Sequence, residues 1–161
     1  DLPLHMEHSY IFQEKDIPTA AQSFYNYGNR LYPLDRLDLI YGDKNVYTTP
    51  RDLLNFSKAM YADNFLTSDL KKMIFQPYSN EKKGMNNYGL GFRMKIFDNG
   101  GKLTYHNGWW HGNTSSLVTL HKDSVTIIAI SNKFTRKTYQ TKRLAPKFGD
   151  YPFKFNAEEG E

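Results

Sequence analysis

The apolar positions of the chain follow two different periods, and the first of them is helical. Leu53, Phe56 and Met60 stand at i, i+3 and i+7, so they would share one face of a helix. The preceding Thr49-Pro50-Arg51-Asp52 supplies a capping hydroxyl, a proline suited to the first turn and a carboxylate near the free amides. This pattern predicts a helix that opens at this stretch and ends near residues 62–63.

Alternation of apolar and polar residues replaces the helical spacing from Tyr88 onward and predicts strands. Asp98-Asn99-Gly100-Gly101 is a strong hairpin turn, and Lys122-Asp123-Ser124 is a second tight connection. Residues 125–130 (VTIIAI) are apolar enough to be buried on both faces of a strand. We therefore expect an antiparallel meander with strands at residues 88–97, 102–109, 114–121 and 125–132.

The remaining segments complete an α+β fold. A second helix is expected from Thr67 or Ser68 to Phe75, before Pro77, and a short basic helix at roughly 135–145. Helices followed by an antiparallel sheet define this fold class, and 161 residues accommodate it as one domain. Within 1–161 we distinguish an irregular segment 1–40, a structured part 41–146 with helices, sheet and terminal helix, and a tail 147–161.

Composition removes several classes of function. The absence of cysteine excludes disulfides, a cysteine nucleophile and thiolate metal sites. No apolar run approaches the roughly 20 residues that a membrane helix needs. The formal charge of +4 is too small by itself to indicate nucleic acid. The basic run at residues 133–147 is typical of a solvated helix face, so we expect no nucleic-acid partner. A basic nucleic-acid binder is kept as a third alternative for the function. The chain begins with Asp-Leu-Pro and shows no signal-peptide pattern, so we expect an excised or processed piece.

Histidine spacing does not favour a metal site. His106 and His111 are five residues apart with Gly108 between them, while His5 and His8 stand in another segment. Zinc-binding helices place two imidazoles and a general base at H-E-x-x-H spacing, which neither pair has. We therefore expect separate surface or pocket histidines, no metal and no other cofactor.

Two Ser-x-x-Lys matches raise the possibility of a serine nucleophile with a lysine base, because this spacing puts both side chains on one helix face. The first, from Ser68 to Lys71, opens a predicted helix, where Ser68 is better explained as a cap. The second, from Ser79 to Lys82, lies in a polar loop, and Tyr27-Gly28-Asn29 matches a Tyr-x-Asn element equally weakly. Matches of this kind are expected by chance, so we assign the nucleophile to neither serine.

The predicted strand at residues 102–109 carries the most specific chemistry. Successive side chains of a strand point to opposite faces. Thr104, His106 and Gly108 would therefore share one face, and Leu103, Tyr105 and Asn107 the other. A glycine at the end of this face would let a ligand pair with the backbone as an extra strand. The alternative is an edge strand with a buried histidine and a glycine-rich turn, which spacing alone favours.

Four segments in a fixed order resemble the serine β-lactamase-like family, which includes class C β-lactamases, D-Ala-D-Ala carboxypeptidases, penicillin-binding-type hydrolases and related esterases. YGLGFR at residues 88–93 resembles its Y-G-L-G-[WF] strand. Tyr105-His106-Asn107-Gly108, followed by Gly112, resembles its third motif, Lys-Thr-Gly or His-x-Gly. The others are GDKNVYTTPRDLL at residues 42–54 and IIAISNK at residues 127–133, while residues 2–9 resemble a P-L-G-M segment. The resemblance implies a partial β-lactamase/transpeptidase-like fold.

The resemblance also implies roles for single residues. His106 stands at the Lys/His position, which helps to hold a substrate carboxylate and supports the proton network, and we predict it as catalytic. The backbone amide of Trp109 would be one of two oxyanion-hole donors. Gly108, Asn107 and Asn132 are predicted to bind substrate, although Asn107 replaces a threonine hydroxyl of the family.

The same resemblance implies what this chain lacks. The family's Ser-x-x-Lys and Tyr-x-Asn motifs precede the P-L-G-M segment, so we expect both N-terminal to Asp1 and expect the isolated chain to be inactive. The parent would be a bacterial, extracytoplasmic serine hydrolase that cleaves the amide or ester bond of a β-lactam or D-Ala-D-Ala-type peptide through an acyl-serine intermediate. The alternative is a non-catalytic module that binds a peptide or peptidoglycan fragment. Uncovered sheet edges would favour a homo-oligomer or swapped dimer.

Overall fold

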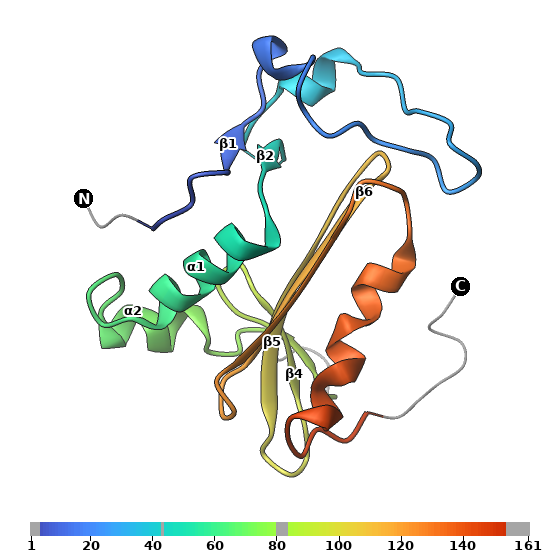
Figure 1. Cartoon of the computed structure of the whole chain (residues 1–161). Helices are drawn as coiled ribbons and strands as arrows, with labels where there is room; N and C mark the ends of the chain where they lie inside the picture. The colour runs from blue at the N-terminus through green and yellow to red at the C-terminus, as the bar shows by residue number, and fades with distance from the viewer. Residues whose placement is uncertain (1–3, 43, 80–83, 154–161) are drawn as a thin grey trace.

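The computed structural model describes residues 4–42, 44–79 and 84–153, which form a sheet with helices on both faces (Figure 1). The lysine of the Ser79 motif, all residues after Phe153 and the start of the P-L-G-M-like stretch lie outside the described residues. The elements are β1 (Tyr10–Ile11), η1 (Glu14–Asp16), η2 (Arg36–Leu39), β2 (Val46–Tyr47), α1 (Pro50–Tyr61), α2 (Ser68–Ile74), β3 (Asn86–Tyr88), β4 (Arg93–Ile96), β5 (Lys102–Trp110), β6 (Asn113–Leu120), β7 (Val125–Ser131) and η3 (Arg136–Lys147). The predicted α+β class is confirmed.

The first two predicted helices form as α1 and α2, and a threonine caps each of them. The hydroxyl of Thr49 accepts a hydrogen bond from the Asp52 amide at 3.1 Å, as its position before Pro50 predicted. The second cap is Thr67, whose hydroxyl accepts from the Leu70 amide at 3.3 Å. The prediction that Ser68 caps this helix is therefore wrong, because Ser68 is already its first helical residue.

The sheet is an antiparallel meander in the order β3-β4-β5-β6-β7. The hairpin predicted at residues 98–101 joins β4 to β5, with Phe97 and Gly101 bonded at its base. The single strand predicted at residues 88–97 is wrong, because a tight turn divides it into β3 and β4. In that turn Gly91 has φ +81°, a conformation that favours glycine, and the Gly89 amide donates to the Phe92 carbonyl at 2.7 Å.

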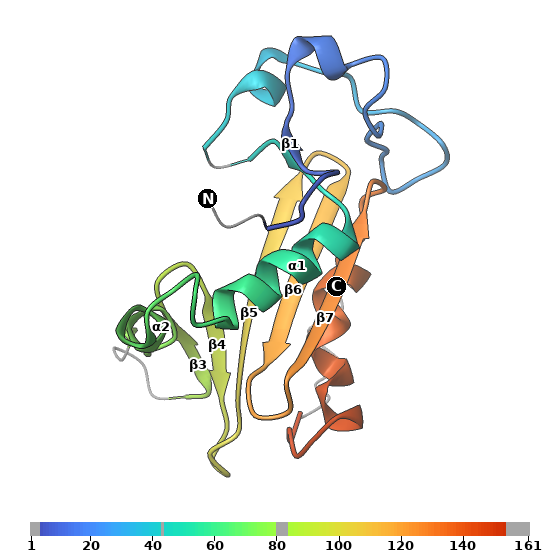
Figure 2. The ribbon, with the colours of Figure 1, turned by 60° about the vertical axis from the view of Figure 1, so that its left-hand side comes forward.

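Helices cover the two faces of the sheet and create two apolar clusters (Figures 1 and 2). On the side of α1 and α2, Met60, Phe75 and Met94 are buried together. On the side of η3, the buried cluster consists of Phe97, Leu103, Val118, Leu120, Ala145 and Tyr151. The prediction that β7 is buried on both faces is wrong, because most of its side chains are only half-buried and Ile130 is 38% exposed. The reason is that β7 is the edge strand of the described sheet.

The N-terminal segment folds over the end of the β5–β6 hairpin, at the top of Figure 1. It is anchored to the sheet at Phe24, whose amide donates to the Asn132 carbonyl and whose carbonyl accepts from the Phe134 amide. The amide of His8 and the hydroxyl of Ser9 both donate to the Asp52 carboxylate, which ties the segment to α1. None of the helices in the described part of the chain is long and apolar enough to span a lipid bilayer.

Candidate functional site

The second half of β5 lacks a paired strand on its β4 side in the described structure. Strand β4 pairs with β5 only from Ile96↔Lys102 to Arg93↔Tyr105, whereas β6 pairs with β5 as far as Trp110. Because Phe97 donates to the Gly101 carbonyl, the odd-numbered residues of β5 point their backbone groups toward β4. Continuing this alternation, Asn107 and Trp109 present their amides and carbonyls to the edge that β4 leaves unpaired.

His106 lies beside this edge and is exposed. Its Nε2 is 3.3 Å from the Tyr88 hydroxyl, which either donates to or accepts from the ring according to the tautomer. Tyr88 belongs to β3, two strands away from β5, so the turn between β3 and β4 brings it to the motif. Sequence reasoning used Tyr88 only as part of a family pattern and missed this contact, which no spacing rule reveals.

Gly108 pairs with Ser115 of β6 and has little room for a side chain. A Cβ added to Gly108 would overlap the Ser115 hydroxyl. A glycine at this position therefore leaves room for the Ser115 side chain of β6. It would also leave room for a ligand that approaches along the edge. Ser115 is a functional candidate that the sequence analysis did not single out, because its relation to Gly108 depends on the register of the sheet.

The side chains of Asn107 and Trp109 lie away from the His106 face, because neighbouring residues of a strand alternate. Asn107 pairs with Ser116, whose hydroxyl accepts a hydrogen bond from Thr141 of η3. The Asn107 Oδ1 atom is buried without a hydrogen-bond partner. The Trp109 ring is 69% exposed and its Nε1 donates to the His111 carbonyl at 2.9 Å. Any role of these two residues at the edge therefore falls to their backbone groups.

Asn132 follows β7 at the end of the sheet where β5 meets β6, and its side chain is already engaged. Its Nδ2 donates to the Gln22 carbonyl at 2.9 Å, which fastens the N-terminal segment to the sheet. The structure thus brings His106, Gly108 and the Trp109 backbone together on one strand, and places Asn132 two strands away. Its assignment to substrate binding stays a prediction.

The turn after β5 forms a polar centre around Asp38, a buried residue of η2. The Asp38 carboxylate accepts from Trp110 Nε1 at 2.6 Å and from the Asp35 amide at 2.7 Å, and its Oδ1 lies 3.3 Å from His111 Nε2. The Asp35 carboxylate lies 3.6 Å from the same nitrogen. Asp35, Asp38 and His111 thus bring together three side chains of the types that coordinate divalent metals. Hydrogen bonds within the chain explain the position of Asp38, whereas His111 Nε2 is buried without a hydrogen-bond partner among the described residues. The absence of a metal stays a prediction.

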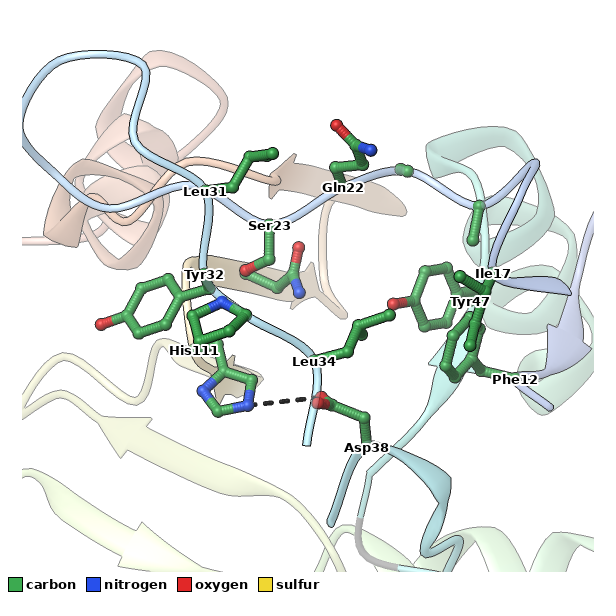
Figure 3. A pocket seen from close by; sticks show the side chains of 14 residues that line it. Phe12, Ile17, Gln22, Ser23, Leu31, Tyr32, Leu34, Asp38, Tyr47 and His111 are labelled. Carbon is green, nitrogen blue, oxygen red and sulfur yellow. Dashed lines mark ion pairs between the residues drawn. The ribbon is translucent and has the colours of Figure 1, made fainter. Parts of the chain in front are cut away.

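A cavity of about 370 Å³ adjoins this centre, between the N-terminal segment and the turn (Figure 3). Phe12, Ile17, Leu34 and Tyr47 form its apolar wall, and the neighbouring side chains of His111 and Asp38 line it as well. His111 is five residues beyond His106, or about 17 Å along an extended strand. The cavity is therefore a separate feature from the open edge.

A third histidine lies on the α1 side of the sheet, the face to which Thr104 and His106 belong. His121 Nε2 is 2.8 Å from the Thr104 hydroxyl, and its ring contacts those of Tyr61 and Phe75. Burial, and secondarily the charge of Lys102, lowers the pKa of His121 to about 4, so the ring is neutral at neutral pH. This side chain supports the strand that carries His106, and the sequence alone gave no sign of the pairing.

The serine candidates are not arranged for catalysis in the described structure. Lys71 donates to the Asp63 carboxylate and to the Tyr61 carbonyl, both at 2.8 Å, and not to Ser68. The lysine of the Ser79 match lies outside the described residues, and the Tyr27 side chain is 83% exposed. The expectation that neither serine is the nucleophile is consistent with these contacts.

Comparison with solved structures identifies the fold. A penicillin-binding protein from Bacillus halodurans matches 91% of this chain and 46% of its own length, with TM-score 0.72 and 13% identity. The octameric penicillin-binding protein homologue from Pyrococcus abyssi matches 90% of this chain and 35% of its own, with TM-score 0.72 and 18% identity. A D-stereospecific amidohydrolase from Streptomyces matches 89% of this chain and 44% of its own length, with TM-score 0.64 and 12% identity. The fold is therefore that of part of a penicillin-binding or β-lactamase-like protein.

The sequence comparison points to the same family. Penicillin-binding protein 4* of Bacillus subtilis (strain 168) is 29% identical over 104 residues, which are 65% of this chain and 23% of that protein. No family model matches the chain. The resemblance to the β-lactamase-like and penicillin-binding-type serine hydrolase family, deduced above from four motifs, is thus confirmed for a partial chain. The chain spans less than half the length of the relatives it matches.

Proposed function

We propose that this chain supplies one wall of the active site of a serine hydrolase that cleaves an amide or ester bond. The observation that carries the proposal is the unpaired edge of β5, where His106 stands beside the outward-facing backbone groups of Asn107 and Trp109. An extended substrate can pair with this edge as an additional strand. The carbonyl oxygen of the substrate would then accept a hydrogen bond from the Trp109 amide, which serves as one oxyanion-hole donor.

The chemical step needs a nucleophile, a base and stabilisation of the developing oxyanion. A base takes the proton of a serine hydroxyl as its oxygen attacks the carbonyl carbon, and the Trp109 amide holds the negative oxygen. The carbonyl then re-forms, the leaving group departs with that proton, and water hydrolyses the acyl-serine to the acid and the free serine. His106 and Tyr88 form a hydrogen-bonded pair that can orient the substrate and relay a proton at this edge. We assign the serine and its base to a part of the parent protein outside this chain, because Lys71 is engaged elsewhere.

The substrate class we propose is a β-lactam or a D-Ala-D-Ala-type peptide, with the parent acting outside the cytoplasm. The support is the family resemblance and the backbone edge, which suits a peptide-like substrate. The second candidate is a non-catalytic module that binds a peptide or peptidoglycan fragment on the same edge. That candidate is favoured by the edge itself, which requires no nucleophile to bind an extended ligand.

Active-site labelling tests where the nucleophile resides. We expect a fluorophosphonate or penicillin probe to label the parent protein at one serine and to leave this isolated chain unlabelled. Stoichiometric labelling of Ser68 or Ser79 in the isolated chain would overturn the assignment. If the folded parent turns over no ester or lactam yet binds a D-Ala-D-Ala peptide, the binding module replaces the hydrolase.

Replacement of Trp109 by proline tests the oxyanion role directly. Proline deletes the outward amide without removing a bond to β6, so the fold should survive. Trp109→Ala is the matched control, since it removes the indole and keeps the amide. We expect the parent's kcat to fall at least about 100-fold in Trp109→Pro and only slightly in Trp109→Ala. Equal activity of the two variants, with equal thermal unfolding, would contradict the proposed donor.

A further inference from the structure

Three side chains meet where the N-terminal segment contacts the turn between β5 and β6. Asp35 is the N-cap of η2, Asp38 lies within η2, and His111 occupies the turn with φ +51°. Their ligand atoms, two carboxylate oxygens and an imidazole nitrogen, all lie within 4.8 Å of one another. Carboxylate oxygen and imidazole nitrogen together suit zinc, whereas calcium and magnesium prefer oxygen ligands alone.

The imidazole nitrogen of this group points to a further ligand. His111 Nε2 is buried and has no hydrogen-bond partner among the described residues. It lies 3.3 Å from Asp38 Oδ1 and 3.6 Å from Asp35 Oδ2, beyond the usual range of about 2.7–3.2 Å for an N–H···O hydrogen bond. A buried polar atom without a partner is costly, so its position is explained if it binds an additional group.

The spacing of the three ligand atoms matches a tetrahedral zinc site. Zinc bonds of about 2.0–2.2 Å place two ligands of a tetrahedron about 3.3–3.6 Å apart, the range of both distances from His111 Nε2. An octahedral magnesium site would need neighbouring ligands only about 3.0 Å apart. The Asp35 side chain is half-exposed and can turn, so a zinc ion can contact all three atoms with small adjustments.

Contacts around the group hold each ligand in place. Asp38 accepts from Trp110 Nε1 at 2.6 Å and from the Asp35 amide at 2.7 Å, and each carboxylate oxygen keeps a second lone pair for a metal. Asp35 uses Oδ1 to cap η2, which leaves Oδ2 beside His111. The rings of Tyr32 and Trp110 pack on the His111 ring, with centroids 5.0 Å and 4.4 Å away. Such hydrogen bonds and packing orient the ligands of protein metal sites.

We propose that Asp35, Asp38 and His111 bind one zinc ion, which links the N-terminal segment to the turn between β5 and β6. Three protein ligands leave a fourth position for water or a bound molecule, and the cavity of about 370 Å³ that Asp38 and His111 line gives access to it (Figure 3). The site is independent of the proposed function of β5. The expectation of no metal rests on the spacing of histidine pairs, and it does not apply to one histidine joined to two aspartates of another segment.

Zinc titration of the whole chain, after treatment with EDTA and removal of the chelator, tests the binding. We expect one ion per chain, and we expect Asp35→Asn to raise Kd at least about tenfold, because it removes an anionic ligand. Asparagine caps a helix as well as aspartate, so η2 should persist. Asp16→Asn is the matched control, since Asp16 belongs to the capping box of η1 in the same segment but not to the group. Equal weakening by the two variants, or no zinc binding, would overturn the site.

Imidazole NMR signals identify the histidine that binds. We expect zinc to shift the His111 ring signals and to leave those of the other histidines unchanged. Shifts at His5 and His8 instead, with binding that His8→Gln removes, would show adventitious zinc only and overturn the site. Displacement of the zinc by a modest excess of calcium would overturn the assignment of the metal, because calcium prefers oxygen ligands.

Hydrogen exchange tests the link between the two elements. Bound zinc should slow amide exchange over residues 10–47, because it stabilises the docked form of this segment by mass action. Asp35→Asn should lose this protection, and Asp16→Asn should keep it. Exchange over residues 10–47 that is unchanged at saturating zinc would overturn the proposed link.

Discussion

The hydroxyl of Tyr88 lies 3.3 Å from Nε2 of His106, although the two residues belong to strands separated by β4. The contact is possible because β4 pairs with β5 only as far as Tyr105, one residue before His106. The turn at Gly89–Phe92 therefore has two effects. It ends the pairing of β4 with β5, which leaves the rest of the β5 edge free, and it brings the Tyr88 hydroxyl to His106 beside that edge.

The first prediction concerns this hydroxyl. In the parent protein, Tyr88→Phe should lower kcat about tenfold, because the His106 ring loses a hydrogen bond that orients it. The folded structure should be unaffected, since the ring itself remains. Tyr78→Phe is a matched control, because the Tyr78 hydroxyl donates to the Met73 carbonyl away from β5. If both variants keep full activity, the Tyr88 hydroxyl has no part in the site.

The second prediction separates two glycines of the motif region. A Cβ at Gly112 would overlap the backbone of Phe24, which has no freedom to move, so Gly112→Ala should destabilise the chain by about 3 kcal/mol or more. A Cβ at Gly108 meets only the Ser115 hydroxyl, which can rotate, so Gly108→Ala should cost about 1 kcal/mol. Urea unfolding measures both values, and Ser115→Ala should restore the stability of Gly108→Ala. Equal losses in the two variants would contradict this account.

The sequence predicted the regular elements better than the site. Capping by Thr49, the hairpin turn at residues 98–101 and the alternation of β5 depend on local rules, and the structure reproduces them. The division of residues 88–97 was missed because Gly89 packs against the end of α2, which is a tertiary constraint. The Tyr88–His106 and Gly108–Ser115 relations depend on strand order and register, which no local pattern encodes.

The role of the tryptophans was predicted only in part. The family resemblance gave a role to the Trp109 backbone amide. In the structure, Trp109 is exposed, whereas Trp110 donates to the buried carboxylate of Asp38, 72 residues away in sequence. A single buried acid in an irregular segment carries no periodic signal, so this centre could not be found from the sequence.

The third prediction tests that centre. Asp38→Ala should destabilise the chain by about 2–4 kcal/mol, because Trp110 Nε1 and the Asp35 amide would lose their buried acceptor. Asp35→Ala should cost only about 1 kcal/mol, the usual value for an N-cap. Hydrogen exchange should accelerate over residues 10–47 in Asp38→Ala before the sheet itself opens. Uniform acceleration over the whole chain would show that Asp38 does not specifically hold the N-terminal segment.

The fourth prediction follows from His121, whose pKa burial lowers to about 4 from 6.5. Between these two pH values the unfolded chain binds a proton that the folded chain excludes, so stability must fall as the pH falls. The loss from this one group should be on the order of 3 kcal/mol across the window, and it should level off below the folded pKa.

His121→Gln keeps a hydrogen-bonding partner for Thr104 and removes the titration. The difference in unfolding free energy between the original chain and this variant should therefore change with pH from 6.5 to 4 and be constant above that range. Urea unfolding at several pH values measures this difference, and the NMR titration of the His121 ring gives the folded pKa directly. A pH-independent difference would show that the ring is solvated in the folded chain, so that its contacts with Tyr61 and Phe75 do not exclude water.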